Sequence, residues 1–336
     1  MKLRPIHTLT LAATLLTATA ASAQTKLLLS TFFPPGHPIV AKVLVPWAKD
    51  VETSTAGRVK IEFASSSLAP PPGQLDMVQK GIADVALQYT GVVPKRLQPE
   101  MLTELPGPGA SSVQMSKALW ATHERYFQKD ARYKGVKLMS LFAFPNQGFY
   151  CLKECFTTID EFHSAKIATT PGTAARQWGA LTSGIVAGPA VRYFEVVSKG
   201  IVDAYAAVTP IEVSSFNLAP STKGVLRFKN LETAGSFAFV LNQRKWDGLG
   251  DADKAAIARL GGAAFADRLA ALDEASAASV KQMKEAGFKF SDASDALNAE
   301  LRKRFAFLEK EWIKDAKTRG IDGTAAVKFY REQLIH

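Results

Sequence analysis

The sequence predicts an α/β protein composed of two similar lobes that are joined by long C-terminal helices. Three observations lead to this prediction. The phrase Lys-Gly-Ile-Ala/Val-Asp occurs at residues 80–84 and again at 199–203, 119 residues apart. Each copy follows a helical pattern and precedes an apolar run that is typical of a buried strand. From Asp251 onward the chain is rich in Ala, Lys and Glu, which favours long helices that span both lobes.

The repeated phrase has a local physical explanation. A glycine just past the end of a helix adopts the left-handed conformation that ends it. We expect the next residue, Ile82 or Ile201, to enter the core. We expect the aspartate, Asp84 or Asp203, to bond nearby backbone as the chain turns into a strand. Helices that stop at glycine are common, so chance recurrence is the alternative to a structural repeat.

Residues 1–23 have the pattern of a secretory signal peptide. Lys2 and Arg4 precede an uncharged apolar run, and the small residues at its end fit cleavage after Ala23. The run is shorter than the roughly 20 apolar residues that a membrane-spanning helix needs. We therefore expect a periplasmic mature protein that is not embedded in the membrane.

The composition limits the partners of the mature chain. Removal of the signal peptide lowers the formal net charge from +10 to +8 and leaves about 313 residues, enough for two domains with separate cores. The surplus charge is spread along the chain without a basic run, so nucleic acid is not an expected partner. A solvated surface explains the charge; attraction to an anionic ligand or a membrane surface is the less specific alternative.

Cys151 and Cys155 are the only cysteines, and the oxidising compartment favours a disulfide between them. In a straight strand, residues four apart lie about 13 Å from each other, whereas a disulfide requires α-carbons within about 7 Å. Residues 152–154 would then form a tight turn. The alternative is two buried free thiols. A metal site is not expected, because His163 is the nearest histidine and no further ligand cluster accompanies it.

The predicted first lobe alternates strands and helices. A strand at 26–30 is followed by an amphipathic helix whose apolar stripe contains Ile39, Val43, Trp47 and Val51. The remaining elements are strand 59–63, helix 74–80, strand 85–87, helix 111–127 and strand 136–144. This alternation indicates half of a doubly wound sheet.

The predicted second lobe repeats this order. Its elements are strand 166–168, helix 173–182, strand 185–187 and helix 191–199. The mixed pattern at 144–157 marks the crossing between the lobes. We assign residues 24–147 and 237–275 to the first lobe and residues 148–236 and 276–336 to the second, with hinges near 145–149 and 236–237.

A ligand is expected between the lobes. In open α/β sheets, ligands bind beyond the carboxyl ends of the strands, and two facing lobes form a cleft there. Catalysis needs a converging set of acid, base, nucleophile or metal groups. The body of the chain has only His37, His123 and His163, and no phosphate-binding glycine loop, nucleophile elbow or zinc motif. The sequence therefore favours binding over catalysis and predicts no cofactor.

Several short motifs, in their order and spacing, resemble a known family over nearly the whole mature chain. Residues 56–61 (AGRVKI) are similar to its "GRV" strand entry, and residues 75–84 (LDMVQKGIAD) to its helix-to-strand segment. Its "LP" turn, "DLKGKKIR" segment, "GVVDG" phrase and "MN…W..LP" segment are similar to residues 104–106, 159–167, 200–203 and 239–249. The family is that of the periplasmic solute-binding subunits of tripartite ATP-independent periplasmic (TRAP) transporters, of the dicarboxylate-binding (DctP-like) type.

The resemblance implies a Venus-flytrap protein that captures a small organic solute, usually an organic acid, and delivers it to a sodium-driven membrane permease. In this family an arginine typically clamps the ligand carboxylate, because a planar guanidinium matches its two oxygens. Here Ala168 occupies that position, Tyr150 that of a second arginine, and Ala207 lies near that of an asparagine. These departures predict a more apolar and aromatic pocket, suited to a neutral or aromatic solute.

The candidate pocket residues comprise aromatic walls, hydrogen-bonding groups and the clamp position. They are Phe32, Phe33, Tyr89, Tyr150, Tyr205 and Phe237; Thr90, Gln147, Thr169, Thr170 and Thr209; and Ala168. Core packing is the alternative role for each aromatic residue. Arg176 is the best substitute cation, or else a solvated helix residue. His37 reaches the cleft from its loop, or else caps the following helix.

Solute capture for a TRAP permease is the predicted function, with closure of the lobes around the ligand as its mechanism. An orphan receptor that signals to a membrane sensor kinase would have the same soluble chain. A secreted enzyme on a two-lobe scaffold would need at least two titratable groups that converge in the cleft.

Overall fold

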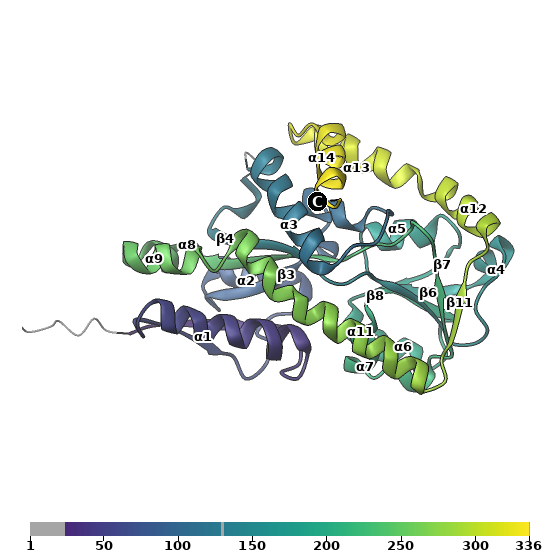
Figure 1. Cartoon of the computed structure of the whole chain (residues 1–336), viewed down its shortest axis with the longest axis horizontal. Coiled ribbons are helices and arrows are strands. Elements are labelled where there is room, and N and C mark those ends of the chain that lie inside the picture. The colour runs from purple at the N-terminus through teal and green to yellow at the C-terminus, as the bar shows by residue number, and fades with distance from the viewer. Residues whose placement is uncertain (1–23, 129–130, 336) are drawn as a thin grey trace, which may run out of the picture.

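A computed structural model describes residues 24–128 and 131–335, so the predicted signal peptide lies outside the described residues. The strands of the first sheet are β1 (Thr25–Ser30), β2 (Val59–Phe63), β3 (Val85–Tyr89), β4 (Val136–Ala143) and β10 (Ser236–Asn242). Those of the second sheet are β5 (Gly148–Cys151), β6 (Lys166–Thr169), β7 (Gly184–Ala187), β8 (Ala204–Val208), β9 (Gly224–Arg227) and β11 (Lys289–Asp292). Each sheet forms the centre of one lobe (Figure 1).

Helices cover both sheets. In the first lobe a π-helical segment, Ile39–Leu44, continues into α1 (Val45–Ser54), followed by α2 (Gln74–Lys80), α3 (Ser112–Thr122), α8 (Gln243–Asp247), α9 (Asp251–Ala258) and α10 (Gly262–Ala266). The second lobe has α4 (Ile159–Ser164), α5 (Thr173–Gly179), α6 (Tyr193–Val197) and α7 (Pro210–Ser215). The chain ends in α11 (Ala270–Glu285), α12 (Asp295–Phe305), α13 (Phe307–Thr318) and α14 (Gly323–Gln333).

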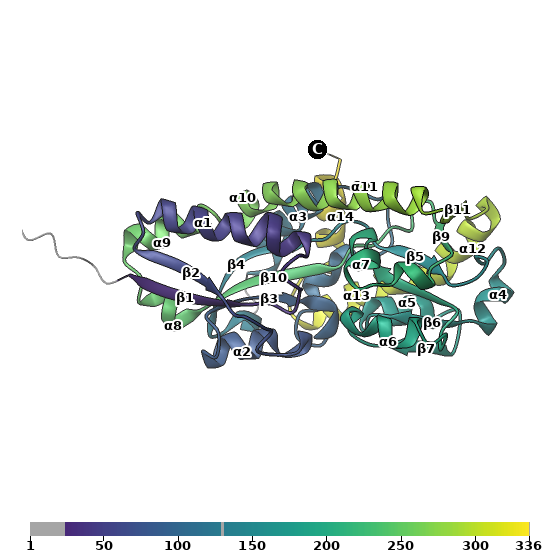
Figure 2. The same ribbon diagram turned by 90° about the horizontal axis from the view of Figure 1, so that it is seen from below.

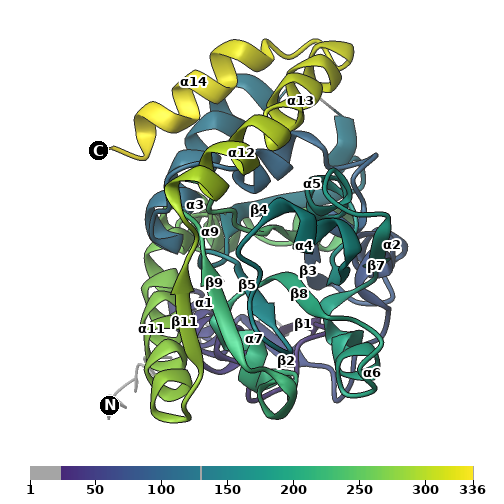
Figure 3. The same ribbon diagram turned by 90° about the vertical axis from the view of Figure 1, so that its right-hand side faces the viewer.

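The two sheets have the same topology. The first runs in the order β2-β1-β3-β10-β4, and the second, read from its far end, runs β7-β6-β8-β5-β9, with β11 added at the edge beside β9 (Figure 3). In each sheet one strand is antiparallel to its neighbours: β10 in the first and β5 in the second. Both strands begin just after the chain has crossed from the other lobe. The antiparallel strand of each sheet therefore follows directly in the chain after a strand of the other sheet: β5 follows β4, and β10 follows β9.

The elements predicted for the two lobes are present, together with others that the sequence pattern did not reveal, among them β5, β9, β10 and β11. β5 lies within the mixed segment at the crossing between the lobes. It is only four residues long and its central residues are buried, so it shows no alternation of apolar and polar residues that would indicate a strand. β11 is a short, largely exposed edge strand in the region for which only helices were predicted. Its sequence, Lys-Phe-Ser-Asp, carries no apolar signal because the strand covers little of the core.

The repeated phrase adopts the same structure twice. Gly81 and Gly200 have positive φ angles of 73° and 63°. Asp84 Oδ2 accepts a hydrogen bond from Leu28 N–H at 2.8 Å, and Asp203 Oδ2 accepts one from Lys166 N–H at 2.9 Å. In both lobes this bond ties the turn to the neighbouring strand, β1 or β6. The prediction for the two aspartates is therefore confirmed, and the phrase is a structural repeat.

The prediction for the isoleucines of the phrase is wrong. Ile82 and Ile201 are 55% and 46% exposed, and the residues that enter the core are Ala83 and Val202. The backbone N–H of each isoleucine still bonds back to the preceding helix, Ile82 to Met77 O and Ile201 to Val196 O. The side chain consequently stays at the helix end, and the chain reaches the core one residue later.

The C-terminal helices bridge the lobes, as predicted. α11 runs along both halves of the molecule (Figure 2) and contacts α3 and the π-helical segment of the first lobe and α7 of the second. α13 contacts α5 and the 3₁₀ segment Pro99–Glu104, and so also touches both lobes. α14 packs on α3 of the first lobe, although its position in the chain suggested the second. No helix within the described ranges has the length and apolarity to cross a membrane.

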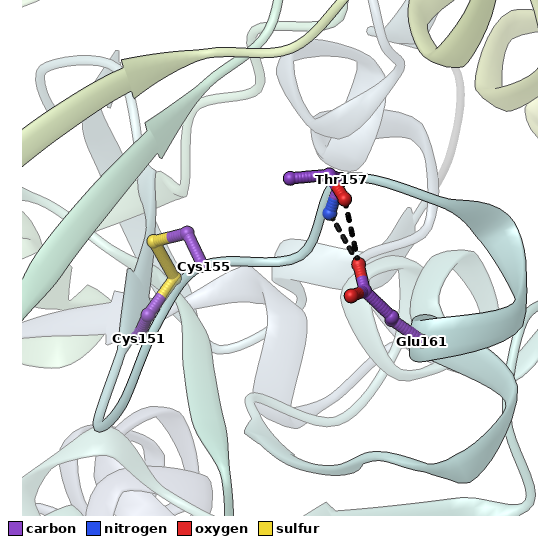
Figure 4. The surroundings of a disulfide bond; sticks show 4 residues. All are labelled: Cys151, Cys155, Thr157 and Glu161. Carbon is purple, nitrogen blue, oxygen red and sulfur yellow. Dashed lines mark hydrogen bonds between the residues drawn. A yellow bond between two sulfur atoms is a disulfide. The ribbon is translucent and has the colours of Figure 1, made fainter.

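A disulfide joins Cys151 at the end of β5 to Cys155, with α-carbons 5.3 Å apart (Figure 4). Residues 152–154 form the tight turn that this spacing requires. Just beyond it, Glu161 accepts hydrogen bonds from the backbone and hydroxyl of Thr157, and with Thr158 it closes the capping box of α4. The second lobe thus has a covalent link at one end of its central strand.

Candidate functional site

A cavity lies between the lobes at the carboxyl ends of the central strands. The volume that water can occupy in this cavity is about 50 Å³, several times what one water molecule needs. The first lobe contributes Phe32, Phe33, Pro71, Tyr89, Val92, Phe144 and Phe237; the two crossings contribute Gln147 and Gly235; and the second lobe contributes Thr170, Pro189, Ala190, Val191, Ala207, Val208, Thr209, Glu212 and Phe216. Residues from both lobes therefore enclose it.

The first lobe supplies most of the aromatic wall. The ring of Phe237 lies 4.3 Å from that of Phe144 and 5.2 Å from that of Tyr89, measured between centroids. Phe33 extends this group, with its ring 5.5 Å from that of Phe144. Offset and tilted ring pairs of this kind pack favourably and leave a flat apolar surface that suits another ring.

The second lobe supplies small and polar groups instead. Thr209 and Glu212 form the capping box of α7: Glu212 Oε2 accepts the Thr209 N–H at 2.6 Å, and the Thr209 hydroxyl accepts from Ile211 N–H. This arrangement fixes the Glu212 carboxylate at the cavity wall, where it is 4% exposed.

His37 of the first lobe pairs with Glu212 of the second. His37 Nδ1 accepts the Ile39 N–H at 3.2 Å, so this nitrogen carries no proton. The proton therefore lies on Nε2, which donates to Glu212 Oε1 at 3.1 Å. His37 thus both bonds the start of the following helix and reaches the second lobe, where its Nε2–H donates to the carboxylate.

A second link between the lobes joins Tyr89 to Thr170. Their hydroxyl oxygens are 3.1 Å apart. Nearby, a Cβ atom on Gly172 would lie 2.8 Å from the carbonyl oxygen of Gly91, and Gly172 has a φ of +83°. The backbones of the two lobes approach this closely because residue 172 is glycine.

Glu104 is a buried carboxyl group beside this link. It is 2% exposed, and neither of its oxygens has a hydrogen-bond partner. Burial raises its pKa to about 8, although the nearby hydroxyls of Thr173 and Tyr89 favour the charged form. Glu104 is therefore held largely in its neutral form, and it lies near the start of α5 in the second lobe.

Gln147 connects the crossing to the second lobe. Its Nε2 donates to Ala207 O at 3.1 Å, and its Oε1 accepts from the Thr233 hydroxyl at 3.1 Å. Its amide is therefore fully oriented at the base of the cavity.

Seven residues that the sequence analysis proposed lie in the cavity wall: Phe32, Phe33, Tyr89, Gln147, Thr170, Thr209 and Phe237. Two others lie directly behind it. His37 acts through Glu212, and the hydroxyl of Thr90 lies 2.6 Å from that of Ser236 inside the first sheet.

The remaining proposed residues do not line the cavity. Tyr150, Ala168 and Tyr205 lie in the core of the second lobe, where the rings of the two tyrosines stack 4.9 Å apart. Thr169 is fully buried at the end of β6. Arg176 pairs with Glu311 of α13 on the outside of the molecule and is not a substitute clamp. Burial in the second lobe, or for Arg176 an ion pair with α13, keeps these side chains out of the cavity lining, and sequence alone did not reveal this packing.

Sequence reasoning missed Glu212, Phe144 and Phe216. Phe144 and Phe216 follow the ends of β4 and α7, and apolar residues there are typical of core packing. Glu212 had a visible signal, the capping-box pattern Thr-Pro-Ile-Glu, but this pattern indicates a helix start rather than a ligand site. Its proximity to His37, 175 residues away, is a tertiary feature.

The charge of the cavity wall is unusual for an acid-binding site. None of the described residues that line it is Lys or Arg, and the only carboxylate among them is that of Glu212. Among the described residues, no group of three or more His, Cys, Asp or Glu could hold a metal ion. The site can therefore enclose an uncharged ring and accept hydrogen bonds from it.

Two lobes that enclose an aromatic cavity between the carboxyl ends of their strands define a solute-binding protein. The bacterial extracellular solute-binding proteins of family 7 match residues 29–315, and the chain belongs to that family. It is 30% identical over 307 residues to the outer membrane transporter protein TsaT of Comamonas testosteroni, with 91% of each chain covered.

Two solved structures of TRAP solute-binding proteins are similar over almost the whole chain. One, from Bordetella bronchiseptica with (R)- and (S)-mandelate bound, has a TM-score of 0.88 and 28% identity, and the match covers 93% of this chain and 99% of that one. The other, from an unidentified marine microbe, is specific for aromatic acids and holds 3-hydroxybenzoate. Its TM-score is 0.84 and its identity 25%, with 94% and 99% covered.

Proposed function

We propose that this protein captures an uncharged aromatic solute between its lobes and delivers it to a TRAP-type membrane permease. The observation that carries the proposal is the cavity wall, which combines a cluster of rings with one carboxylate and contains no lysine or arginine among its described residues. The aromatic acids bound by the two similar proteins support a ring-shaped ligand.

The charge of the wall argues against a carboxylate on that ring. Two like charges 4 Å apart repel by about 4 kcal/mol at the effective dielectric constant of a protein surface. No lysine or arginine among the described residues of the wall offsets the Glu212 charge. An amide or hydroxyl group would instead donate a hydrogen bond to the carboxylate, so we expect a ligand with an N–H or O–H group.

Isothermal titration of matched pairs tests this selectivity. Benzamide and benzoate, and mandelamide and mandelate, have nearly the same shape and differ in charge. We expect each amide to bind at least tenfold more tightly than its acid. Equal or tighter binding of the acids would contradict the proposal.

A substitution at Glu212 identifies the group responsible. Glu212→Gln removes the charge while keeping a hydrogen-bonding side chain, so the preference for amides should shrink or reverse. Glu161→Gln is the matched control, because Glu161 closes the same type of capping box at α4, outside the cavity lining. It should leave the preference unchanged.

Delivery to a permease requires export and release. We infer that the precursor is cleaved after Ala23 and that the mature chain acts in the periplasm as a binding protein without catalytic activity. N-terminal sequencing of the exported protein tests the cleavage site. Uptake of a labelled ligand into vesicles that contain the cognate permease, with and without this protein, tests the delivery.

A further inference from the structure

A second, larger cavity lies next to the first and forms a groove at the surface. The volume that water can occupy in this groove is about 810 Å³, compared with about 50 Å³ for the inner cavity. Phe32, Phe33, Val191 and Phe216 line both cavities, so the two adjoin each other. The first two residues belong to the first lobe and the last two to the second.

The outer groove is apolar and uncharged. None of the described residues that line it is Lys, Arg, Asp or Glu. Its two sides expose large apolar side chains from opposite lobes: Val45 of α1 is 47% exposed and Phe194 of α6 is 45% exposed. The burial of such apolar surface by a ligand is favourable in free energy.

We propose that the outer groove binds an apolar extension of the same ligand, so that the solute is an elongated aromatic molecule with an alkyl or aryl substituent. This inference rests on the proposed function for the ring in the inner cavity. The groove is much the larger of the two spaces, and four shared wall residues place it directly against the inner cavity. A substituent there touches both lobes and therefore also favours the closed form.

Chain length provides the experimental test. Two series of probes, benzamides and benzoates that carry a meta or para alkyl group from methyl to butyl, are titrated calorimetrically against the mature protein. Burial of one methylene group corresponds to an affinity gain of about fourfold. We expect such a gain for each added carbon in at least one ring position.

A pair of variants tests whether the alkyl chain lies in the groove. Phe194→Ser removes one wall of the groove and should abolish most of the gain with chain length, while binding of the unsubstituted parent stays the same. Ile201→Ser is the control, because Ile201 is an apolar residue of the same lobe with nearly equal exposure, 46%, outside the groove. It should preserve the whole gain.

The outcomes separate this inference from the proposed function. A gain in the benzoate series together with weaker benzamides supports the groove and overturns the proposed preference for uncharged ligands. Constant or falling affinity in both series overturns the groove, and so does a gain that persists in Phe194→Ser. Absence of binding by every probe overturns both.

Discussion

The two lobes share one framework and differ in the walls that they present to the cleft. In both, a glycine ends a helix, an aspartate ties the turn to the neighbouring strand, and a five-strand order repeats. The central strands then end differently, β3 in Tyr89 and β8 in Val208. The first lobe presents rings and the second presents small and polar groups.

The framework and the specificity are therefore encoded separately. Backbone bonds at the amino ends of the central strands set the framework, and these bonds need only glycine and aspartate at fixed positions. Side chains at the carboxyl ends face the cleft and are free to differ.

The largest effect is expected at Glu104, a buried acid of the first lobe. Its pKa is about 8 in the folded protein and 4.5 ordinarily. Because the folded state holds the proton more tightly, its contribution to stability is complete below pH 4.5 and is lost progressively as the pH rises toward 8. By pH 7 the loss is roughly 3 kcal/mol. Glu104→Gln should remove this pH dependence and stabilise the protein at pH 8, as measured by urea unfolding.

Glu100 is the control for this prediction. It lies in the same 3₁₀ segment and is equally buried, but it pairs with Arg132 at 2.6 Å. Glu100→Gln should therefore destabilise the protein at pH 8, because it breaks the buried ion pair between Glu100 and Arg132. Stabilisation by both substitutions, or by neither, would contradict the distinction between a paired and an unpaired acid.

The two aspartates of the repeat offer a direct comparison. The Asp84 side chain is 10% exposed and that of Asp203 is 39% exposed. Asp84→Ala leaves a buried N–H without a partner and should cost about 2 to 3 kcal/mol, whereas Asp203→Ala should cost about 1 kcal/mol because water reaches its site. Urea unfolding of both variants measures the difference. Equal losses would mean that burial does not distinguish the two bonds.

The disulfide distinguishes the second lobe from the first. Replacing Cys151 and Cys155 together by alanine removes a five-residue loop closure and should cost about 2 kcal/mol. Hydrogen exchange locates the loss: protection of β5 and β8 should fall, while β1 and β3 keep theirs. A uniform loss across both sheets would show that the lobes unfold as one unit.

The smallest effect is expected at the contact between the lobes. Tyr89→Phe removes the hydroxyl that lies 3.1 Å from that of Thr170 and should weaken the closed form by about 1 kcal/mol. X-ray scattering without ligand should then show a larger radius of gyration than that of the natural chain, while the midpoint of urea unfolding stays nearly unchanged. An unchanged radius would indicate that this bond does not hold the lobes together.

The sequence predicted the framework because its signals are local. The stripe Ile39, Val43, Trp47 and Val51 and the limits of α2 were readable from neighbouring residues, and the structure agrees with both. Strand ends also directed attention to Tyr89 and Thr170, which do line the cavity.

Tertiary structure alone decided which side chains enclose the ligand site. Tyr150 and Tyr205 were equally plausible wall residues, but the register of β5 and β8 turns both rings into the core. His37 and Glu212 come from different lobes, and only the closure of those lobes joins them. Helix caps and strand patterns depend on residues a few positions apart, whereas the charge and shape of the cavity depend on packing between segments that the chain keeps far apart.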